Sequence, residues 1–298
     1  MNELPARRFG SVATAMVTPF HEDGSIDLDS AKALATKLVD DGCDCILVSG
    51  TTGESPTTHQ PEKNDLIVVV KEAVGDRAFI LAGAGSNDTA HAVRIAEASQ
   101  ENGADGLLVV SPYYNRPSQI GLQAHVRAVA DATDLPVMLY DIPGRTGLAF
   151  SDETMDLLSG HPRILGVKDA TGKVEQGLVR MEHTGMEWYS GDDGLNFAFL
   201  AGGASGVISV VAHVAASHYR KMVEAVDAGD LVAARQVNAS LRPLVDAIMG
   251  GGQGAVMAKW ACYLQGAIES PTVRLPLVAP GEEEIGRLRT VMQEMDLL

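Results

Sequence analysis

The sequence predicts a (β/α)8 barrel, an α/β fold, followed by a C-terminal helical region. Short apolar runs alternate with longer amphipathic stretches over roughly the first 228 residues. Most of these runs are apolar on successive residues, as parallel strands buried on both faces are. Eight such strand–helix units close into a barrel of about 250 residues. An open, doubly wound sheet is the alternative that the alternation by itself leaves open.

The expected strands are rich in aliphatic and β-branched residues and end at polar or turn residues. One of them, Val137–Tyr140, contains no polar side chain that would need to face solvent on alternate positions. The expected strands are Val12–Val17, Cys45–Val48, Phe79–Leu81, Gly106–Val110, Val137–Tyr140, Ile164–Lys168, Glu187–Ser190 and Gly206–Ser209.

The stretches between these runs repeat apolar residues at the spacing of one helical face. In the first, Ala31, Leu34, Ala35 and Leu38 share one side. Several stretches open with residues such as Ser118 that cap helix N-termini. The expected helices are Asp29–Asp41, Pro61–Val74, Asp88–Asn102, Ser118–Thr133, Asp152–Leu158, Val174–His183, Leu195–Ala201 and Ala212–Ala228.

After Asp227 the pattern changes from alternating units to helices alone. Three further helices are expected at Leu231–Met249, Gln253–Gly266 and Glu282–Met295, with the glycines at 250–252 as a break between the first two. We therefore predict a catalytic barrel over residues 1–228 and a helical region over residues 229–298.

The charge balance excludes several classes of partner. The 298 residues carry 39 acidic and 23 basic side chains, for a formal net charge of −16. Nucleic acids and anionic membranes are bound through clustered Lys and Arg, so neither is an expected partner. An anionic substrate must then be bound by a few local cations.

The sequence also predicts a cytoplasmic protein without a metal or organic cofactor. Its three cysteines cannot form a disulfide framework, and the segment MNELPARRFG lacks the apolar core of a secretory signal. No run reaches the ~20 apolar residues of a membrane span. Cys43-x-Cys45 lacks the second ligand pair of a zinc site. No dinucleotide fingerprint, phosphate-binding P-loop or His-Glu-x-x-His motif is present.

Lys168 is the most informative residue at a strand end. It follows the apolar run Ile164–Val167, and the carboxyl ends of the strands are where such barrels carry their chemistry. Partial burial there would lower the pKa of the amine, as Schiff-base formation requires. The alternative is a lysine whose stem packs while its ammonium reaches water or pairs with Asp169.

Two further features lie at predicted strand ends. The turn Gly50–Glu54 offers backbone N–H groups beside the hydroxyls of Thr51 and Thr52, which suits a small carboxylate, although an ordinary glycine-bounded turn has the same pattern. Arg145 follows a Pro-Gly turn and could bind a second carboxylate, or it is simply a surface arginine.

Tyrosines are concentrated at the same ends of the strands. Tyr113, Tyr114 and Tyr140 make up half of the six tyrosines. Phenols can relay protons, whereas the alternative is packing with a hydrated hydroxyl. As neighbours on a strand, Tyr113 and Tyr114 face opposite ways, so at most one can point directly at Lys168.

In its strand-end motifs the chain resembles the dihydrodipicolinate synthase (4-hydroxy-tetrahydrodipicolinate synthase) family, within the pyruvate-dependent Schiff-base aldolases that include N-acetylneuraminate lyase. The resemblance runs from about Gly10 to the C-terminus, and the GTTGE turn and Arg145 favour the synthases over the sialic-acid lyases. The motifs are GTTGES at Gly50–Ser55, SPYYNRPSQ at Ser111–Gln119, YDIPGRTG at Tyr140–Gly147, GVKDATG at Gly166–Gly172, SGDD at Ser190–Asp193 and GVISV at Gly206–Val210.

The resemblance implies a condensation of pyruvate with L-aspartate 4-semialdehyde through an imine on Lys168, the first committed step of diaminopimelate and lysine biosynthesis. It implies a proton relay, contacts to the two substrates, and backbone positions near the lysine. The relay residues are Tyr140, Thr51 and Tyr114; the substrate contacts are Thr52 for pyruvate and Arg145 for the semialdehyde; the backbone positions are Gly191 and Ile208.

The resemblance also implies a homotetramer, built as a dimer of dimers, in which Tyr114 enters the site of a neighbouring subunit. Feedback-inhibited members bind lysine through a histidine and a glutamate, and the matching positions here are Lys63 and His91. Ser55, Asn87 and Tyr113 of that effector site remain. A cation at the site opposes a cationic ligand, so we expect weak or absent inhibition by lysine.

Two other functions are considered beside this one. A pyruvate-dependent aldolase acting on a sugar acid or another aldehyde would keep the barrel and Lys168 but not depend on Arg145. A non-catalytic sensor of small molecules would keep the fold without forming an imine.

Overall fold

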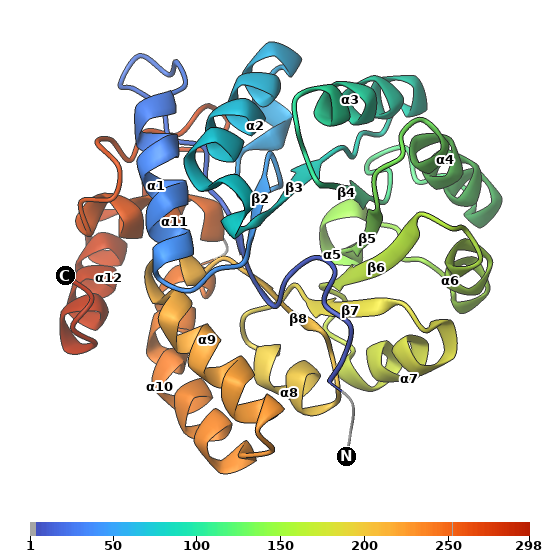
Figure 1. Cartoon of the computed structure of the whole chain (residues 1–298). Coiled ribbons are helices and arrows are strands. Elements are labelled where there is room, and N and C mark those ends of the chain that lie inside the picture. The colour runs from blue at the N-terminus through green and yellow to red at the C-terminus, as the bar shows by residue number, and fades with distance from the viewer. Residues whose placement is uncertain (1–3, 252) are drawn as a thin grey trace.

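Eight parallel strands form a closed barrel surrounded by helices. The computed structural model describes residues 4–251 and 253–298. The strands follow one another around the barrel in chain order, and β8 pairs with β1 to close it (Figure 1). The predicted (β/α)8 barrel is confirmed, and the open sheet is excluded because no edge remains between β1 and β8.

The strands lie where the apolar runs predicted them, with small shifts at their ends. They are β1 (Val12–Ala15), β2 (Cys45–Val48), β3 (Phe79–Gly83), β4 (Gly106–Val110), β5 (Val137–Asp141), β6 (Ile164–Asp169), β7 (Glu187–Ser190) and β8 (Gly206–Ser209). The first strand is two residues shorter than expected. The Val17 N–H leaves the sheet and donates to Nε2 of the buried His213 at 2.9 Å.

The helices that cover the barrel begin and end close to the predicted positions. Asp27 caps the first of them by accepting from the Ser30 N–H, and Ser118 caps α4 in the same way. These helices are α1 (Leu28–Asp40), α2 (Gln60–Val74), α3 (Thr89–Glu101), α4 (Gln119–Asp131), α6 (Asp152–Ser159), α7 (Val174–Thr184), α8 (Asn196–Ala201) and α9 (Ala212–Asp227). Three short helical turns were not predicted: η1 (Ser55–Thr57), η2 (Gly75–Arg77) and α5 (Pro143–Thr146).

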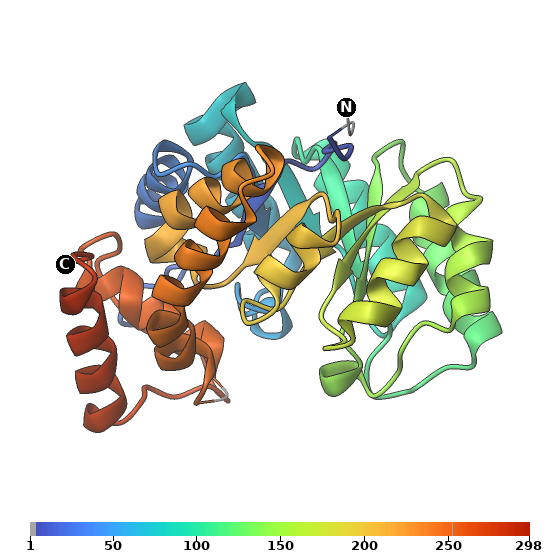
Figure 2. The same cartoon turned by 90° about the horizontal axis from the view of Figure 1, so that it is seen from below.

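The C-terminal helices gather on one side of the barrel. They are α10 (Leu231–Met249), α11 (Gly254–Leu264) and α12 (Glu282–Glu294), and they pack on one another and on α9. Figures 1 and 2 show them far from α6 and α7. Gly250 ends α10 by donating to the Asp246 carbonyl, whereas Gly252 of the predicted break lies outside the described residues. The division of the chain at residue 228 stays a prediction.

The core has two layers, one between strands and helices and one inside the barrel. The inner layer includes Phe9, whose ring meets Phe79 and Tyr189 edge-on with centroids 5.4 and 6.1 Å apart. Phe79 and Tyr189 lie on β3 and β7, so these rings fill the barrel interior below the carboxyl ends of the strands. Within the described ranges, no helix is both long enough and apolar enough to span a lipid bilayer.

Candidate active site

Lys168 lies at the carboxyl end of β6, beside Tyr140 on β5. The strand register pairs the two residues, and the lysine Nζ lies 4.3 Å from the centre of the Tyr140 ring. Only 5 % of the lysine is exposed. Burial lowers the pKa of its ammonium group to about 8, against the opposing effect of the negative charge of Asp193. The amine is therefore neutral often enough to attack a ketone.

Gly191 leaves the space that the Lys168 side chain occupies. A Cβ at this position would lie 2.9 Å from both Cγ and Cε of the lysine, closer than carbon atoms approach without displacement. The Gly191 N–H also donates to the Asp169 carbonyl at 2.8 Å. Ile208, on β8, is 1 % exposed and packs in the inner layer of the barrel. Of these two predicted residues, Gly191 is the one whose missing side chain leaves room for the lysine.

Tyr140 is buried and protonated. Burial raises the pKa of its phenol to about 12, while the positive charge of Arg145 and hydrogen bonding with Thr51 act in the opposite direction. The ring is 5 % exposed. At neutral pH the hydroxyl is thus a proton donor, on a ring that lies beside the amine.

The turn that carries Thr51 and Thr52 is held by its own backbone and by β1. Its end residue Glu54 has a left-handed backbone, φ 55°. Thr18, just after β1, donates through its hydroxyl to the Gly53 carbonyl at 2.7 Å. As a result Thr51 is exposed to the cavity, whereas Thr52 is 8 % exposed.

Glu54 joins this turn to the C-terminal helical region. Its carboxylate pairs with Lys259 of α11, and both side chains are buried. The other carboxylate oxygen accepts from the Arg274 N–H at 2.9 Å. The ammonium of Lys259 also donates to the Thr272 carbonyl at 2.9 Å. Lys259 was not predicted from the sequence, because its partner Glu54 is 205 positions away and no local pattern marks the pair.

A cavity of about 200 Å³ opens at the carboxyl ends of β2 to β5. Its wall is apolar at Leu108, Val110 and Ile142. Of the predicted residues, Thr51, Ser55, Tyr113, Tyr140 and Arg145 line it, whereas Lys168, Thr52, Gly191 and Ile208 are not among its lining residues. Arg145 is exposed, so its guanidinium is free to meet an anionic group in the cavity.

Tyr113 and Tyr114 lie in the loop after β4, not on the strand. Because β4 ends at Val110, the expected alternation of strand faces does not apply to them, and that interpretation is wrong. Tyr113 lines the cavity of its own chain. Tyr114 has a left-handed backbone, φ 73°, and is 90 % exposed. Within one chain it does not line the cavity that contains Tyr140.

The five residues matched to an effector site line one second pocket. Ser55, Lys63, Asn87, His91 and Tyr113 all contribute to its wall. The Lys63 Nζ donates within the chain, to the Ser55 carbonyl at 2.9 Å, the Ser55 hydroxyl at 3.0 Å and the Thr58 hydroxyl at 2.7 Å. Burial lowers the pKa of Lys63 to about 8.

Within the described part of the chain, no group of three or more His, Cys, Asp or Glu side chains is arranged to hold a metal ion. The three cysteines are free and buried, and burial raises the thiol pKa of Cys43 and Cys262 to about 12. That the site needs neither metal nor organic cofactor stays a prediction.

A buried lysine with a lowered pKa at the carboxyl ends of the strands of a (β/α)8 barrel defines the class as a Schiff-base lyase. The sequence pattern of the dihydrodipicolinate synthetase family matches residues 8–295. The 4-hydroxy-tetrahydrodipicolinate synthase of Mycolicibacterium paratuberculosis is 52% identical over 99% of this chain and 98% of its own. The chain belongs to the dihydrodipicolinate synthetase family, as its motifs predicted.

Solved structures of this family have the same fold. The enzyme of Acinetobacter baumannii, complexed with pyruvate, superposes with a TM-score of 0.93 at 34% identity, over 97% of this chain and 100% of that one. The enzyme of Cyanidioschyzon merolae, with lysine bound, superposes with a TM-score of 0.93 at 40% identity, over 97% of this chain and 99% of that one. These relatives favour the synthase over the sugar-acid aldolase considered from sequence.

Proposed function

We propose that this chain is a lyase that condenses pyruvate with L-aspartate 4-semialdehyde through an imine on Lys168. The observation that carries the proposal is the buried amine of Lys168, 4.3 Å from the ring centre of Tyr140, in a chain of this family. No metal or organic cofactor is needed, because the imine itself supplies the electron-accepting group.

The reaction balances without an oxidant or reductant. The neutral Lys168 amine adds to the pyruvate ketone, and loss of water gives the imine. Loss of a methyl proton gives an enamine, whose carbon attacks the aldehyde of the second substrate. The aldehyde oxygen becomes a hydroxyl on protonation. The amino group of the adduct then attacks the imine carbon and releases Lys168, which closes the ring.

Each proton transfer needs a group that donates and accepts. Tyr140, protonated and beside the amine, is the proposed relay residue, with Thr51 passing the proton toward the cavity. Thr52 is proposed to bind the pyruvate carboxylate and Arg145 that of the semialdehyde. Gly191 makes room for the lysine, and Ile208 supports the wall behind it.

Tyr114 is proposed to complete the relay from a neighbouring subunit. It is 90 % exposed and does not line the cavity of its own chain, as expected of an aromatic residue that is used by a partner. This arrangement requires at least a dimer, and we propose a homotetramer made of two such dimers, acting in the cytoplasm.

We also propose that L-lysine inhibits this chain weakly or not at all. The Lys63 ammonium already occupies one wall of the effector pocket and donates to three oxygens there. A second ammonium group placed in the same pocket would be repelled by it.

The choice of acceptor is tested by replacing Arg145. Arg145→Leu should raise the KM for L-aspartate 4-semialdehyde by roughly 10-fold or more, since a charge-assisted contact to a carboxylate is lost. Activity with the neutral D-glyceraldehyde should change little. Arg127→Leu, on the exposed face of α4, is the control. Equal losses with both aldehydes would contradict the assignment.

A further inference from the structure

The loop that carries Arg145 has little structure of its own. It runs from the end of β5, at Asp141, to the start of α6, at Asp152. Its only regular element is α5, a single turn of four residues. One turn of helix is not stable by itself, so contacts from outside the loop must fix the position of Arg145.

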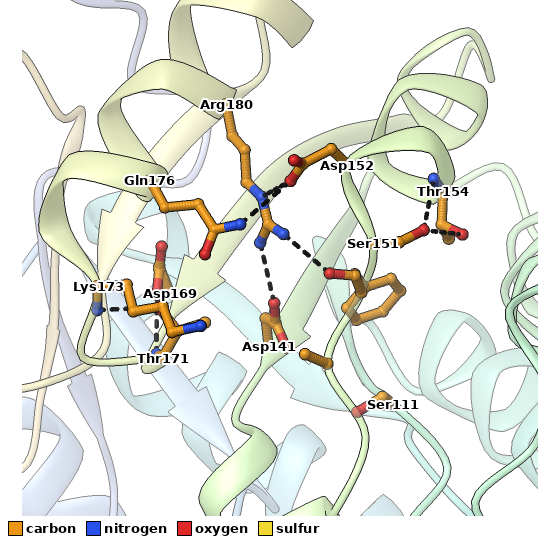
Figure 3. Close-up of polar contacts among 12 residues, drawn as sticks. Ser111, Asp141, Ser151, Asp152, Thr154, Asp169, Thr171, Lys173, Gln176 and Arg180 are labelled. Carbon is orange, nitrogen blue, oxygen red and sulfur yellow. Dashed lines mark hydrogen bonds and ion pairs between the residues drawn. The ribbon is translucent and has the colours of Figure 1, made fainter.

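One guanidinium holds both ends of this loop. Arg180, on α7, donates from Nη1 to the Asp141 carboxylate at 3.4 Å and from Nε to the Asp152 carboxylate at 2.7 Å. Its Nη2 donates to the Phe150 carbonyl at 2.9 Å. Figure 3 shows the Arg180 guanidinium between Asp141 and Asp152, with a dashed contact to each. The three acceptors lie before and after Arg145 in the chain.

The contact between Arg180 and Asp141, at the end of β5, is buried. Arg180 is 7 % exposed and Asp141 is 1 % exposed. Burial raises the pKa of Asp141 to about 7, and the positive charge of Arg180 opposes that shift. Hydrogen bonds between such groups are stronger than those at the surface, because water does not compete for the donors.

The same helix adds a weaker contact, and another strand end supports the middle of the loop. Gln176, one turn before Arg180, donates to Asp152 at 3.3 Å. Ser111, just after β4, donates to the Thr146 hydroxyl and to the Leu148 carbonyl, both at 3.2 Å. Since α7 follows β6, the helix after the Lys168 strand also anchors the Arg145 loop.

We propose that Arg180 is a positioning residue for the second substrate: by joining Asp141 to the Phe150–Asp152 segment it sets the place of Arg145 in the cavity. This inference rests on the proposed function. It requires that loss of the guanidinium fork affects binding of the semialdehyde and leaves capture of pyruvate on Lys168 intact.

The test is Arg180→Lys, which keeps the charge but cannot reach three acceptors at once. The KM for L-aspartate 4-semialdehyde should rise at least about fivefold, because a small displacement of Arg145 weakens its contact with the substrate. The KM for pyruvate and the fraction of chain trapped by pyruvate and borohydride should stay within about twofold of wild type. Far-UV circular dichroism verifies the fold.

The matched control is Arg220→Lys. Arg220 on α9 also uses a guanidinium fork to join two segments, donating to the Gly42 carbonyl at 2.7 and 2.9 Å and to the Ser11 hydroxyl at 2.8 Å. These contacts lie near the start of β1, away from the cavity. Both KM values should stay at their wild-type level in this variant.

A second variant covers the case in which Arg180→Lys does not fold. Asp152 is 71 % exposed on its side chain, so Asp152→Asn leaves the core unchanged and removes one charge from the contact. The KM for the semialdehyde should again rise while pyruvate capture is retained. Wild-type KM values in the folded Arg180 variant, or in Asp152→Asn if that alone folds, would overturn the proposal.

Failure of the proposed function gives a different result. If wild type forms no adduct with pyruvate, or if Arg145→Leu leaves the KM for the semialdehyde unchanged, the assigned reaction or the role of Arg145 is wrong. If wild type forms the pyruvate adduct and Arg145→Leu raises the KM for the semialdehyde, but the Arg180 variants behave like wild type, the function stands and the positioning role of Arg180 is rejected.

Discussion

At the scale of single residues, the reactivity of Lys168 depends on how strongly burial disfavours its charged form. With a pKa of about 8, roughly a tenth of the amine is neutral at pH 7. With its usual value of 10.5, fewer than about one amine in a thousand would be neutral. Gly191 and Tyr140 therefore contribute to chemistry by enclosing this side chain.

The lowered pKa predicts the pH dependence of pyruvate capture. Below pH 8 the rate of trapping should rise about tenfold per pH unit, because the neutral amine is the nucleophile, and above pH 8 it should level off. The measurement is the initial rate of adduct formation with pyruvate and cyanoborohydride at saturating hydride donor. A rate that keeps rising to about pH 10 would show that the amine is not desolvated.

The phenol of Tyr140 is the second residue on which turnover depends. Tyr140→Phe keeps the buried ring and removes the proton donor, so kcat should fall by roughly 10²–10⁴ while the fold survives. Steady-state kinetics measure the fall in kcat, and the thermal unfolding midpoint shows whether the fold survives. A fully active Tyr140→Phe enzyme would remove Tyr140 from the relay.

At the scale of elements, the turn after β2 is stabilised by a contact from α11. Glu54→Gln leaves the fully buried Lys259 ammonium without its carboxylate, which should cost about 3–5 kcal/mol in the free energy of unfolding. Glu62→Gln is the control, since its pair with Arg274 is partly exposed and should contribute less.

Guanidinium chloride unfolding of the two variants gives the comparison. Replacing both partners, as Glu54→Gln with Lys259→Met, should recover much of the lost stability because no unpaired charge remains. Equal destabilisation by Glu54→Gln and Glu62→Gln would show that the buried pair does not secure the turn.

The elements also show what could be predicted from sequence and what could not. Strands and helices were predicted because their periodicity is local, as in Val137–Tyr140. Gly191 and Thr51 were predicted because they lie in motifs at strand ends. The contacts of Arg180 with Asp141 and of Lys259 with Glu54 were not, since they join residues 39 and 205 positions apart that no local pattern connects. Tyr113 and Tyr114 were misread because the strand stops at Val110.

At the scale of the whole molecule, the effector pocket lies next to the active-site cavity. The two share Ser55, Pro56, Gly85 and Tyr113 in their walls. A ligand in the second pocket would therefore touch residues that also face the substrates. Lys63 decides whether lysine can be that ligand, because its ammonium is held in the pocket by hydrogen bonds to Ser55 and Thr58.

The prediction for this pocket is that L-lysine leaves the rate unchanged at sub-millimolar concentration. The assay is the initial rate of condensation with increasing L-lysine at substrate concentrations near KM. Restoring the residues of inhibited relatives, as Lys63→His with His91→Glu, should make the enzyme more sensitive because the opposing cation is gone. Half-inhibition of the wild type by sub-millimolar lysine would contradict the account.

The central claim is that one buried amine captures pyruvate, and covalent trapping tests it most directly. Wild-type protein is incubated with pyruvate and borohydride, and the modified peptide is located by mass spectrometry. We predict a single reduced pyruvate adduct on Lys168 and none in the folded Lys168→Ala variant. A protein that gains no mass, or that gains it equally in Lys168→Ala, would contradict the account.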